Sequence, residues 1–176
     1  MRKLLFSLAA VSLLAAPATA ALKQGAKAPD ITTTGALAGK PFKFHLADAL
    51  KKGPVVLYFF PKAFTSGCTA EAHAFSESID DFKKAGAQVI GMSADNLPTL
   101  EKFSVEECRN AFPVATATPA TQKAYDVAWA AHPGITTRTS YVINRKGKVA
   151  MVHDDLDFSQ HVAKTLAAVK SLKGGR

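Results

Sequence analysis

Cysteine is scarce in this chain, whose 176 residues include only Cys68 and Cys108. There is no C-x-x-C pair, and the spacing of the two cysteines fits no zinc-binding pattern. These absences argue against a dithiol motif and against a structural zinc site. Two thiols still leave two interpretations open, a structural disulfide or a redox couple, and the residues around each cysteine have to distinguish them.

Long apolar runs are also missing, except at the amino terminus. Arg2 and Lys3 precede an almost unbroken apolar run over residues 4–16, and Ala18-Thr19-Ala20 offers small residues for cleavage. This is the layout of a secretory signal peptide, and no lipobox cysteine follows it. We therefore predict a signal peptide at residues 1–20, cleavage near Ala20, and a periplasmic or secreted mature protein without a membrane segment.

The charge pattern lacks the clustering that is typical of nucleic-acid-binding proteins. The formal charge is +8, of which Arg2 and Lys3 contribute +2, so the mature chain keeps +6. The remaining cations are spread over residues 51–52, 83–84, 145–148 and the carboxyl-terminal tail. We interpret them as solvated surface and expect no nucleic-acid partner.

Repeats and low-complexity tracts are absent too, so the mature chain, residues 21–176, suits one domain with a hydrophobic core. Apolar runs and turn signals predict strands over residues 42–45, 55–60, 89–92, 112–115, 140–144 and 148–152. Helical spacing and capping signals predict helices over residues 46–50, 66–84, 98–107, from 119, and 159–172. This order predicts an α/β, thioredoxin-like fold with a mixed central sheet flanked by helices on both faces.

Cys68 lies where sites in open α/β sheets are usually found. It follows a predicted buried strand and occupies the first turn of the predicted helix at 66–84. Unpaired backbone N–H groups and the helix dipole favour a thiolate at this position, and a nearby guanidinium would favour it further. Because the thiolate is the nucleophilic form, the position indicates a reactive cysteine rather than an inert one.

The segment PKAFTSGC, residues 61–68, has proline, threonine and cysteine in the spacing P-x-x-x-T-x-x-C. It resembles the active-site motif of the peroxiredoxins, and RTSYVINRKGKV at 138–149 resembles the segment that carries their active-site arginine. The stretches APDITTTGALAGKPF and VIGMSADN are also similar. The resemblance covers essentially the whole mature chain and is greatest to the bacterioferritin comigratory protein branch. It implies a thiol peroxidase that needs no metal and no organic cofactor.

The resemblance implies a role for each matched residue. Cys68 would be the peroxidatic cysteine, which attacks a peroxide oxygen and becomes a sulfenic acid. Thr65 would hold the thiolate and the bound peroxide together, and Arg138 would stabilise the thiolate and the departing oxygen. Pro61 would shield the site from water and fix the loop. Without the resemblance, Thr65 would be interpreted as a helix cap and Arg138 as a surface residue.

Recycling of a sulfenic acid usually requires another thiol. Many members of the branch place this resolving cysteine five residues after the first, where this chain has His73; others place it one helix later, which implies Cys108. We expect an intramolecular disulfide, reduction by a thioredoxin-like partner, and a monomer. A disulfide requires Cα atoms within about 7 Å, so we also expect local unwinding around one or both cysteines. His73 is predicted to be exposed and Trp129 to be part of the core.

Three functions are compatible with a chain of this kind. The first is a thiol peroxidase acting on hydrogen peroxide and organic hydroperoxides. The second, an exported thiol–disulfide oxidoreductase, would require a second cysteine at the turn, whereas residues 68–73 read CTAEAH. The third, a non-enzymatic thioredoxin-fold domain with a structural disulfide, leaves the joint placement of Pro61, Thr65 and Arg138 unexplained.

Overall fold

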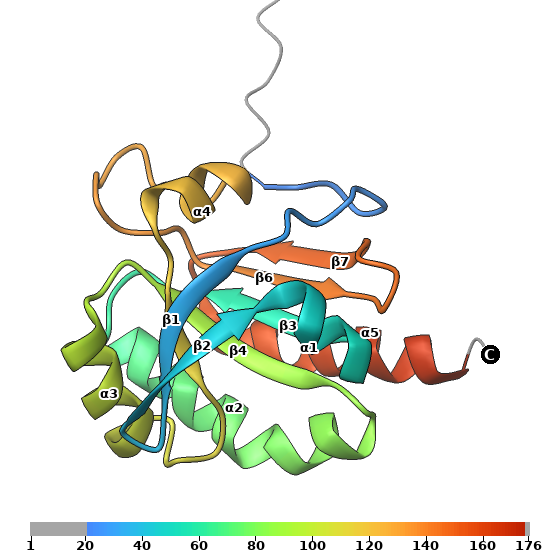
Figure 1. Ribbon diagram of the computed structural model, residues 1–176, viewed down its shortest axis with the longest axis horizontal. Helices are drawn as coiled ribbons and strands as arrows, with labels where there is room; N and C mark the ends of the chain where they lie inside the picture. Colours follow the sequence, from blue (N-terminus) through green and yellow to red (C-terminus); the bar gives the residue numbers. More distant parts are fainter. Residues whose placement is uncertain (1–20, 175–176) are drawn as a thin grey trace, which may run out of the picture.

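Seven strands form one mixed sheet in the order β2-β1-β5-β4-β3-β6-β7, as seen in a computed structural model that describes residues 21–174 (Figure 1). The predicted signal peptide lies outside the described residues. None of the helices between residues 21 and 174 combines the length and the apolar character that a membrane crossing needs.

The elements follow the predicted order along the chain. The strands are β1 (Thr32–Leu37), β2 (Lys40–His45), β3 (Val55–Phe59), β4 (Gln88–Ser93), β5 (Val114–Thr116), β6 (Thr139–Ile143) and β7 (Val149–Asp154). The helices are α1 (Leu46–Lys52), α2 (Ser66–Lys84), α3 (Leu97–Glu106), α4 (Pro119–Ala124) and α5 (His161–Gly174), with a 3₁₀ turn at Phe158–Gln160. Strand β3 pairs parallel with β4 and antiparallel with β6, so the prediction of a mixed sheet is confirmed.

The central strand β3 positions the rest of the molecule. All five of its residues are buried, as expected for an apolar, β-branched run in the middle of a sheet. In its pairing with β6, Phe59 lies opposite Thr139. The carboxyl end of β3, from which the chain leads into α2, is therefore next to the amino end of β6, which Arg138 immediately precedes.

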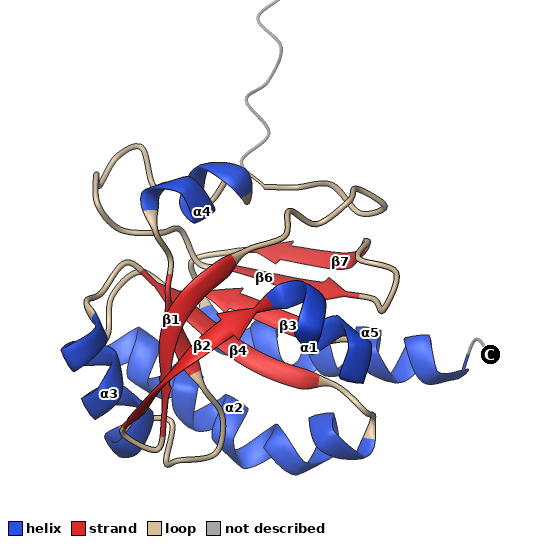
Figure 2. Cartoon of the chain, viewed as in Figure 1, coloured by secondary structure: helices blue, strands red, loops and turns tan. Residues whose placement is uncertain are grey.

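Two hydrophobic clusters fill the space between the sheet and its helices. One contains α1 residues together with Phe59, Tyr125 and Tyr141, and the other packs α2, α3 and α5 against the opposite face of the sheet (Figure 2). Both cysteines belong to the second cluster. Helices thus cover both faces, as predicted, and the two thiols lie on the same side of the sheet.

Local signals explain the helix boundaries. Helix α2 spans the predicted residues and ends just before Gly86, which has φ +79° in the left-handed region that glycine tolerates. The side chain of Asn96 accepts a hydrogen bond from the Thr99 amide at the start of α3. Thr118 caps α4 in the same way, with Pro119 in the first helical position.

Strand β1 and the loop around Trp129 differ from the sequence-based expectations. Strand β1 was not predicted because its sequence, TTTGAL, has no apolar run; it pairs with β2 through a tight turn at Ala38 and Gly39, which both have positive φ. Trp129 is half-buried and lies against His132, so its assignment to the core is wrong. Its loop is held by an isolated bridge rather than by the sheet.

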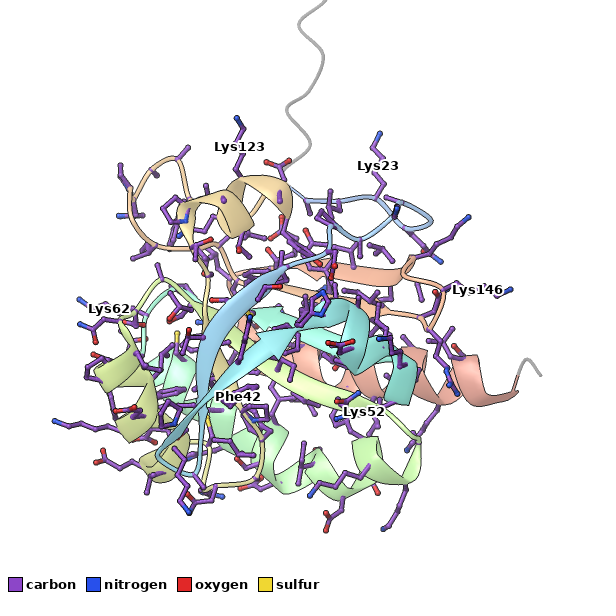
Figure 3. The ribbon with its side chains drawn as sticks, viewed as in Figure 1. Lys23, Phe42, Lys52, Lys62, Lys123 and Lys146 are labelled. Atoms are coloured by element: carbon purple, nitrogen blue, oxygen red, sulfur yellow. The ribbon has the colours of Figure 1, made fainter. Side chains whose placement is uncertain are left out.

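The basic residues are distributed as their sequence spacing suggests. Lys23, Lys62, Lys123 and Lys146 are exposed and lie at separate points around the outside of the molecule (Figure 3). Several other lysines lie near helix ends and pair within their own helix, as Lys51 does with Asp48 and Lys83 with Asp80. This arrangement fits a solvated surface.

Candidate active site

Cys68 is in the first turn of α2 and is almost completely buried, with 1% of its surface exposed. Its thiol is free. The helix begins at Ser66, directly after Thr65, whose backbone is extended and whose carbonyl accepts from the Thr69 amide. The side chain therefore combines the helix-terminus position that was predicted with a burial that was not.

Arg138 supplies the cationic partner that the sequence led us to expect. Its Nη2 donates to the Cys68 Sγ at 3.5 Å, and its Nε donates to the carbonyl oxygen of Leu156 at 2.8 Å. A Cβ on Gly67 would lie 3.3 Å from Nη2, so the glycine leaves room for the guanidinium. Only 6% of Arg138 is exposed. The structure thus brings together two residues that are 70 positions apart in the sequence.

Glu71 completes this arrangement and was not anticipated. It lies one turn after Cys68 on α2, is fully buried, and accepts from Nη1 of Arg138 through its Oε2. Burial raises the pKa of Glu71 to about 7, although Arg138 acts in the opposite direction. A signal was present in the sequence, because Glu71 falls in the helical repeat of Phe75 and Ile79, where an apolar residue is expected.

His161 lies behind Glu71 and explains why the carboxylate has no second donor. The ring Nε2 donates to the Asp155 carbonyl at 2.9 Å, and the ring Nδ1 accepts from the Ser140 hydroxyl at 2.8 Å. Burial lowers the pKa of His161 to about 4, so the ring is neutral at pH 7. Its Nδ1 is 3.7 Å from Glu71 Oε1, which has no hydrogen-bond partner among the described residues.

Thr65 and Pro61 flank the cysteine without bonding to it. Thr65 is exposed, and its hydroxyl donates to the carbonyl of Lys62 at 3.0 Å. Pro61 is partly buried just beyond the end of β3. The loop between them is fixed by the Ala63 amide, which donates to Asp95 Oδ2 at 2.7 Å. Pro61 and Thr65 thus lie in the segment that leads from β3 into α2, and the Thr65 hydroxyl points to the backbone.

Cys108 follows the end of α3 and is fully buried with a free thiol. Burial raises the pKa of the Cys108 thiol well above its ordinary range. His73, predicted to be exposed, is instead partly buried and lies 2.8 Å from Oε2 of Glu107, the residue before this cysteine. His73 therefore faces the segment that carries Cys108.

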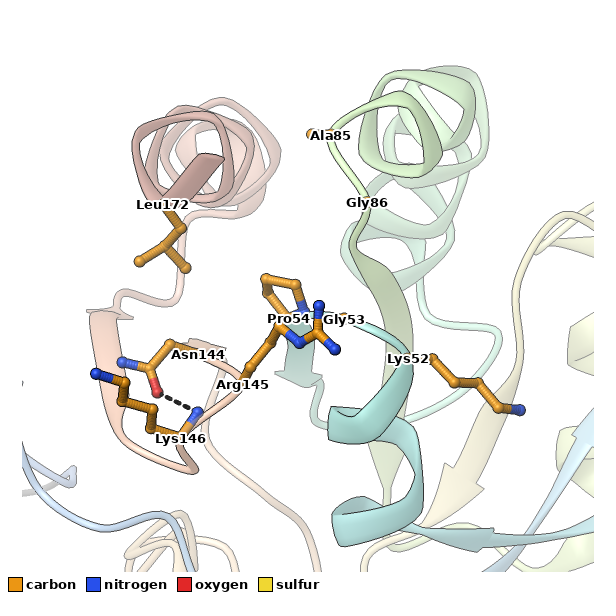
Figure 4. Close-up of a pocket in the computed structure, with 9 residues that line it drawn as sticks. All are labelled: Lys52, Gly53, Pro54, Ala85, Gly86, Asn144, Arg145, Lys146 and Leu172. Atoms are coloured by element: carbon orange, nitrogen blue, oxygen red, sulfur yellow. Dashed lines mark hydrogen bonds between the residues drawn. The ribbon is translucent and has the colours of Figure 1, made fainter. Parts of the chain in front are cut away.

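A cavity of about 400 Å³ lies at the other end of β3 and is separate from Cys68. Its lining comes from the carboxyl ends of α1, α2 and α5, the start of β3 and the β6–β7 turn, and includes Pro54, Arg145 and Leu172 (Figure 4). Arg145 donates to the carbonyl of Lys51, and Lys52 points away from the cavity. Three helix carboxyl termini disfavour an anion there. Within residues 21–174, no group of three or more metal-ligating side chains is placed to hold a metal ion.

Comparison with known proteins agrees with this geometry. Residues 24–152 match the model of the AhpC/TSA family. The chain is 31% identical to the chloroplastic peroxiredoxin Q of Triticum aestivum, over 90% of this chain and 81% of the relative. It is 33% identical to the peroxiredoxin Bcp of Escherichia coli K12, over 61% and 72%.

Solved structures give the same result. The peroxidoxin BcpB of Mycobacterium tuberculosis superimposes with a TM-score of 0.75 at 29% identity, over 86% of this chain and 98% of the other. Peroxiredoxin Q of Xanthomonas campestris does so with a TM-score of 0.69 at 27% identity, over 80% and 90%. The chain therefore belongs to the AhpC/TSA family, as a peroxiredoxin of the peroxiredoxin Q and bacterioferritin comigratory protein branch. Its function is that of a thiol-dependent peroxidase on the thioredoxin-like fold.

The buried carboxylate makes stability depend on pH in a way that Glu71→Gln should remove. The folded-state pKa, about 7, lies above the ordinary 4.5. The folded protein therefore binds more protons in that window, and Glu71 makes the free energy of unfolding fall as the pH rises through it. Glu71→Gln should remove this fall, which we expect to be on the order of 1–3 kcal/mol. Denaturant unfolding at several pH values measures it.

The informative quantity is the difference in the free energy of unfolding between Glu71→Gln and the wild type at each pH. Neutral His161, with a folded-state pKa of about 4 against an ordinary 6.5, acts with the opposite sign: its contribution is lost as the pH falls through that window. Glu106→Gln, at an exposed position on α3, is the matched control and should leave the curve unchanged. Parallel curves for Glu71→Gln and wild type between pH 4.5 and 7 would contradict the assignment.

Proposed function

We propose that Cys68 is the peroxidatic cysteine and Cys108 the resolving cysteine of this peroxidase. The observation that carries the first assignment is the contact of Arg138 Nη2 with Cys68 Sγ at 3.5 Å, in a site closed to bulk water. A guanidinium donating to sulfur favours the thiolate, and the low local dielectric strengthens this interaction. The helix terminus acts in the same direction.

The first step uses the thiolate as a nucleophile. The Cys68 sulfur attacks the terminal oxygen of a hydroperoxide, the O–O bond breaks, and the electron pair leaves with the other oxygen. Sulfur is oxidised to a sulfenic acid, and the leaving alkoxide or hydroxide takes up a proton to become alcohol or water. Arg138 can donate to the departing oxygen from its place beside the sulfur. Thr65, at the start of α2, would hold the peroxide once its hydroxyl turns from Lys62.

The second step forms the disulfide. The Cys108 sulfur attacks the sulfenic sulfur of Cys68, the S–O bond breaks, and the hydroxide leaves with the Cys108 proton as water. A dithiol partner of the thioredoxin type then reduces the Cys68–Cys108 disulfide and becomes oxidised itself. Support for Cys108 comes from its position on the same face of the sheet and in the same hydrophobic cluster as Cys68.

We also propose that the enzyme works outside the cytoplasm as a monomer, on hydrogen peroxide and organic hydroperoxides. The proposal of export rests on the signal-peptide pattern of residues 1–20. Amino-terminal sequencing of the exported protein, which should begin near Ala21, and its mass in solution check these two points.

Cys108→Ser tests the cycle. This variant should oxidise Cys68 once, at the wild-type rate, and should then lose turnover with a thioredoxin-type reductant because no disulfide can form. Stopped-flow mixing with peroxide measures the first step, and dimedone trapping followed by peptide mass spectrometry identifies the sulfenic acid. The wild type, treated identically, should yield a Cys68–Cys108 peptide. Full turnover by Cys108→Ser would show that Cys108 has no part in recycling.

A further inference from the structure

The segment that carries Cys108 is fastened to one face of α2 by three polar contacts. His73 Nε2 lies 2.8 Å from Glu107 Oε2, the Ser76 hydroxyl donates to the Cys108 carbonyl at 2.9 Å, and Arg109 Nη1 donates to Glu77 Oε1 at 3.2 Å. Three consecutive residues, 107–109, thus bind residues 73, 76 and 77, which lie on one face of a helix. We call this set of contacts the clasp.

The backbone of the same segment is held in an unfavourable conformation. Helix α3 ends at Glu106, and the residues directly after Cys108, Arg109 and Asn110, have φ of +51° and +60°. Asparagine tolerates the left-handed region, but arginine does so at a cost. The closed conformation therefore depends on contacts outside the segment, and the clasp supplies them.

The closed conformation also keeps the Cys108 thiol unreactive. The residue is fully buried, its amide donates to the Phe103 carbonyl at 2.9 Å, and no disulfide joins it to Cys68. A buried, protonated thiol is a poor nucleophile. Burial raises the pKa of this thiol, which agrees with the geometry. Formation of the disulfide therefore requires the segment to open first.

The two cysteines differ in how firmly they are held. Cys68 is fixed by the buried Arg138 and by the packing of α2, whereas the His73–Glu107 and Arg109–Glu77 contacts of the clasp are both partly exposed. The side chains of Arg109 and Glu77 are 48% and 67% exposed, and such pairs contribute little to stability. The contacts that hold residues 107–110 closed are therefore weak enough to break during turnover.

We propose that His73 and Glu77 are positioning residues that set how fast Cys108 reaches the Cys68 sulfenic acid. This proposal rests on the proposed roles of the two cysteines. While the clasp is closed, the sulfenic acid can instead react with a second peroxide and become a sulfinic acid, losing the enzyme's activity. The clasp thereby sets the ratio between disulfide formation and over-oxidation.

The test is the double variant His73→Ala/Glu77→Ala. A weak, partly exposed side-chain contact changes an opening equilibrium by about 1.5- to 5-fold, so loss of both should speed disulfide formation about two- to 25-fold. Rapid quenching followed by non-reducing peptide mass spectrometry measures the Cys68–Cys108 peptide against time. The sulfinic acid fraction at high peroxide should fall by a similar factor, and the first, peroxide-dependent oxidation of Cys68 should not change.

Asp80→Ala is the matched control. It removes an exposed ion pair with Lys83 on the same helix, away from the Cys108 segment, and should leave both rates as in the wild type. If the double variant forms the disulfide no faster than the wild type, the proposed role of the clasp is overturned, even when the Cys68–Cys108 peptide is present. If oxidised wild type gives no such peptide, the resolving role of Cys108 falls, and the clasp with it.

Discussion

Replacing Cys68 by serine is expected to abolish peroxide reduction, lowering turnover by at least about 10⁴-fold, as loss of a covalent nucleophile does in other enzymes. A serine hydroxyl stays protonated beside Arg138 at pH 7, so the guanidinium has no thiolate to stabilise. No other described residue can replace it, because the Cys108 thiol is fully buried and its pKa is raised by that burial. Peroxide consumption with a thioredoxin-type reductant measures the loss.

The control for this substitution is Cys108→Ser, which should keep the first oxidation step. The two variants place a hydroxyl at two fully buried positions of the same cluster, so they also control for the cost of burying a polar group. Circular dichroism and denaturant unfolding show whether each variant is folded. Appreciable peroxide consumption by folded Cys68→Ser would mean that the reacting sulfur lies elsewhere.

The sequence was most informative where one physical signal was strong. Helix α2 could be predicted to its end residues because an apolar repeat, a threonine before it and a glycine after it agree. Strand β1 has no such pattern, because the residues that it buries, Thr33, Gly35 and Ala36, are small or polar. Local sequence patterns thus predict those helices and strands whose own residues carry a clear apolar repeat.

The site followed a different rule. Cys68 could be located from its helix terminus, but its partner is 70 residues away, and only the resemblance identified Arg138. Glu71 was not predicted, because a single carboxylate within an apolar repeat has no evident role until the position of Arg138 is known. His73 was wrongly expected at the surface, since nothing in its own helix indicates that Glu107 lies opposite. The candidate site residues could thus be named from the sequence, whereas their contacts became clear only from the fold.

The contacts of Arg138 determine how its positive charge is shared between Glu71 and Cys68. Glu71 and the Cys68 sulfur share one guanidinium in a buried site, so a negative charge on either one reduces the stabilisation that Arg138 gives the other. Glu71 holds Arg138 in place at the cost of part of its charge. Protonation of Glu71, whose pKa is about 7, leaves the whole cation to the sulfur. The site therefore depends on the orientation of Arg138 as much as on its charge.

Arg138→Lys should consequently reduce the rate constant for peroxide reduction by about 10²- to 10³-fold, the loss typical of a donor that stabilises developing charge. The guanidinium makes three bonds in three directions, through Nη2 to Cys68, Nη1 to Glu71 and Nε to Leu156. An ammonium on a flexible stem keeps the charge but cannot make them together. Stopped-flow oxidation of Cys68 under pseudo-first-order peroxide measures the loss, and a rate within tenfold of wild type would contradict it.

A structural defect can be separated from a chemical one at this position. Arg138→Met leaves Glu71 buried without its partner, which should cost about 3–5 kcal/mol of stability above pH 7. The double variant Glu71→Gln/Arg138→Met removes the unpaired charge as well and should recover much of that stability. Because Cys68 still lacks its cation, its reaction with peroxide should stay as slow as in Arg138→Met. Recovery of the rate together with the stability would instead assign Arg138 to the fold alone.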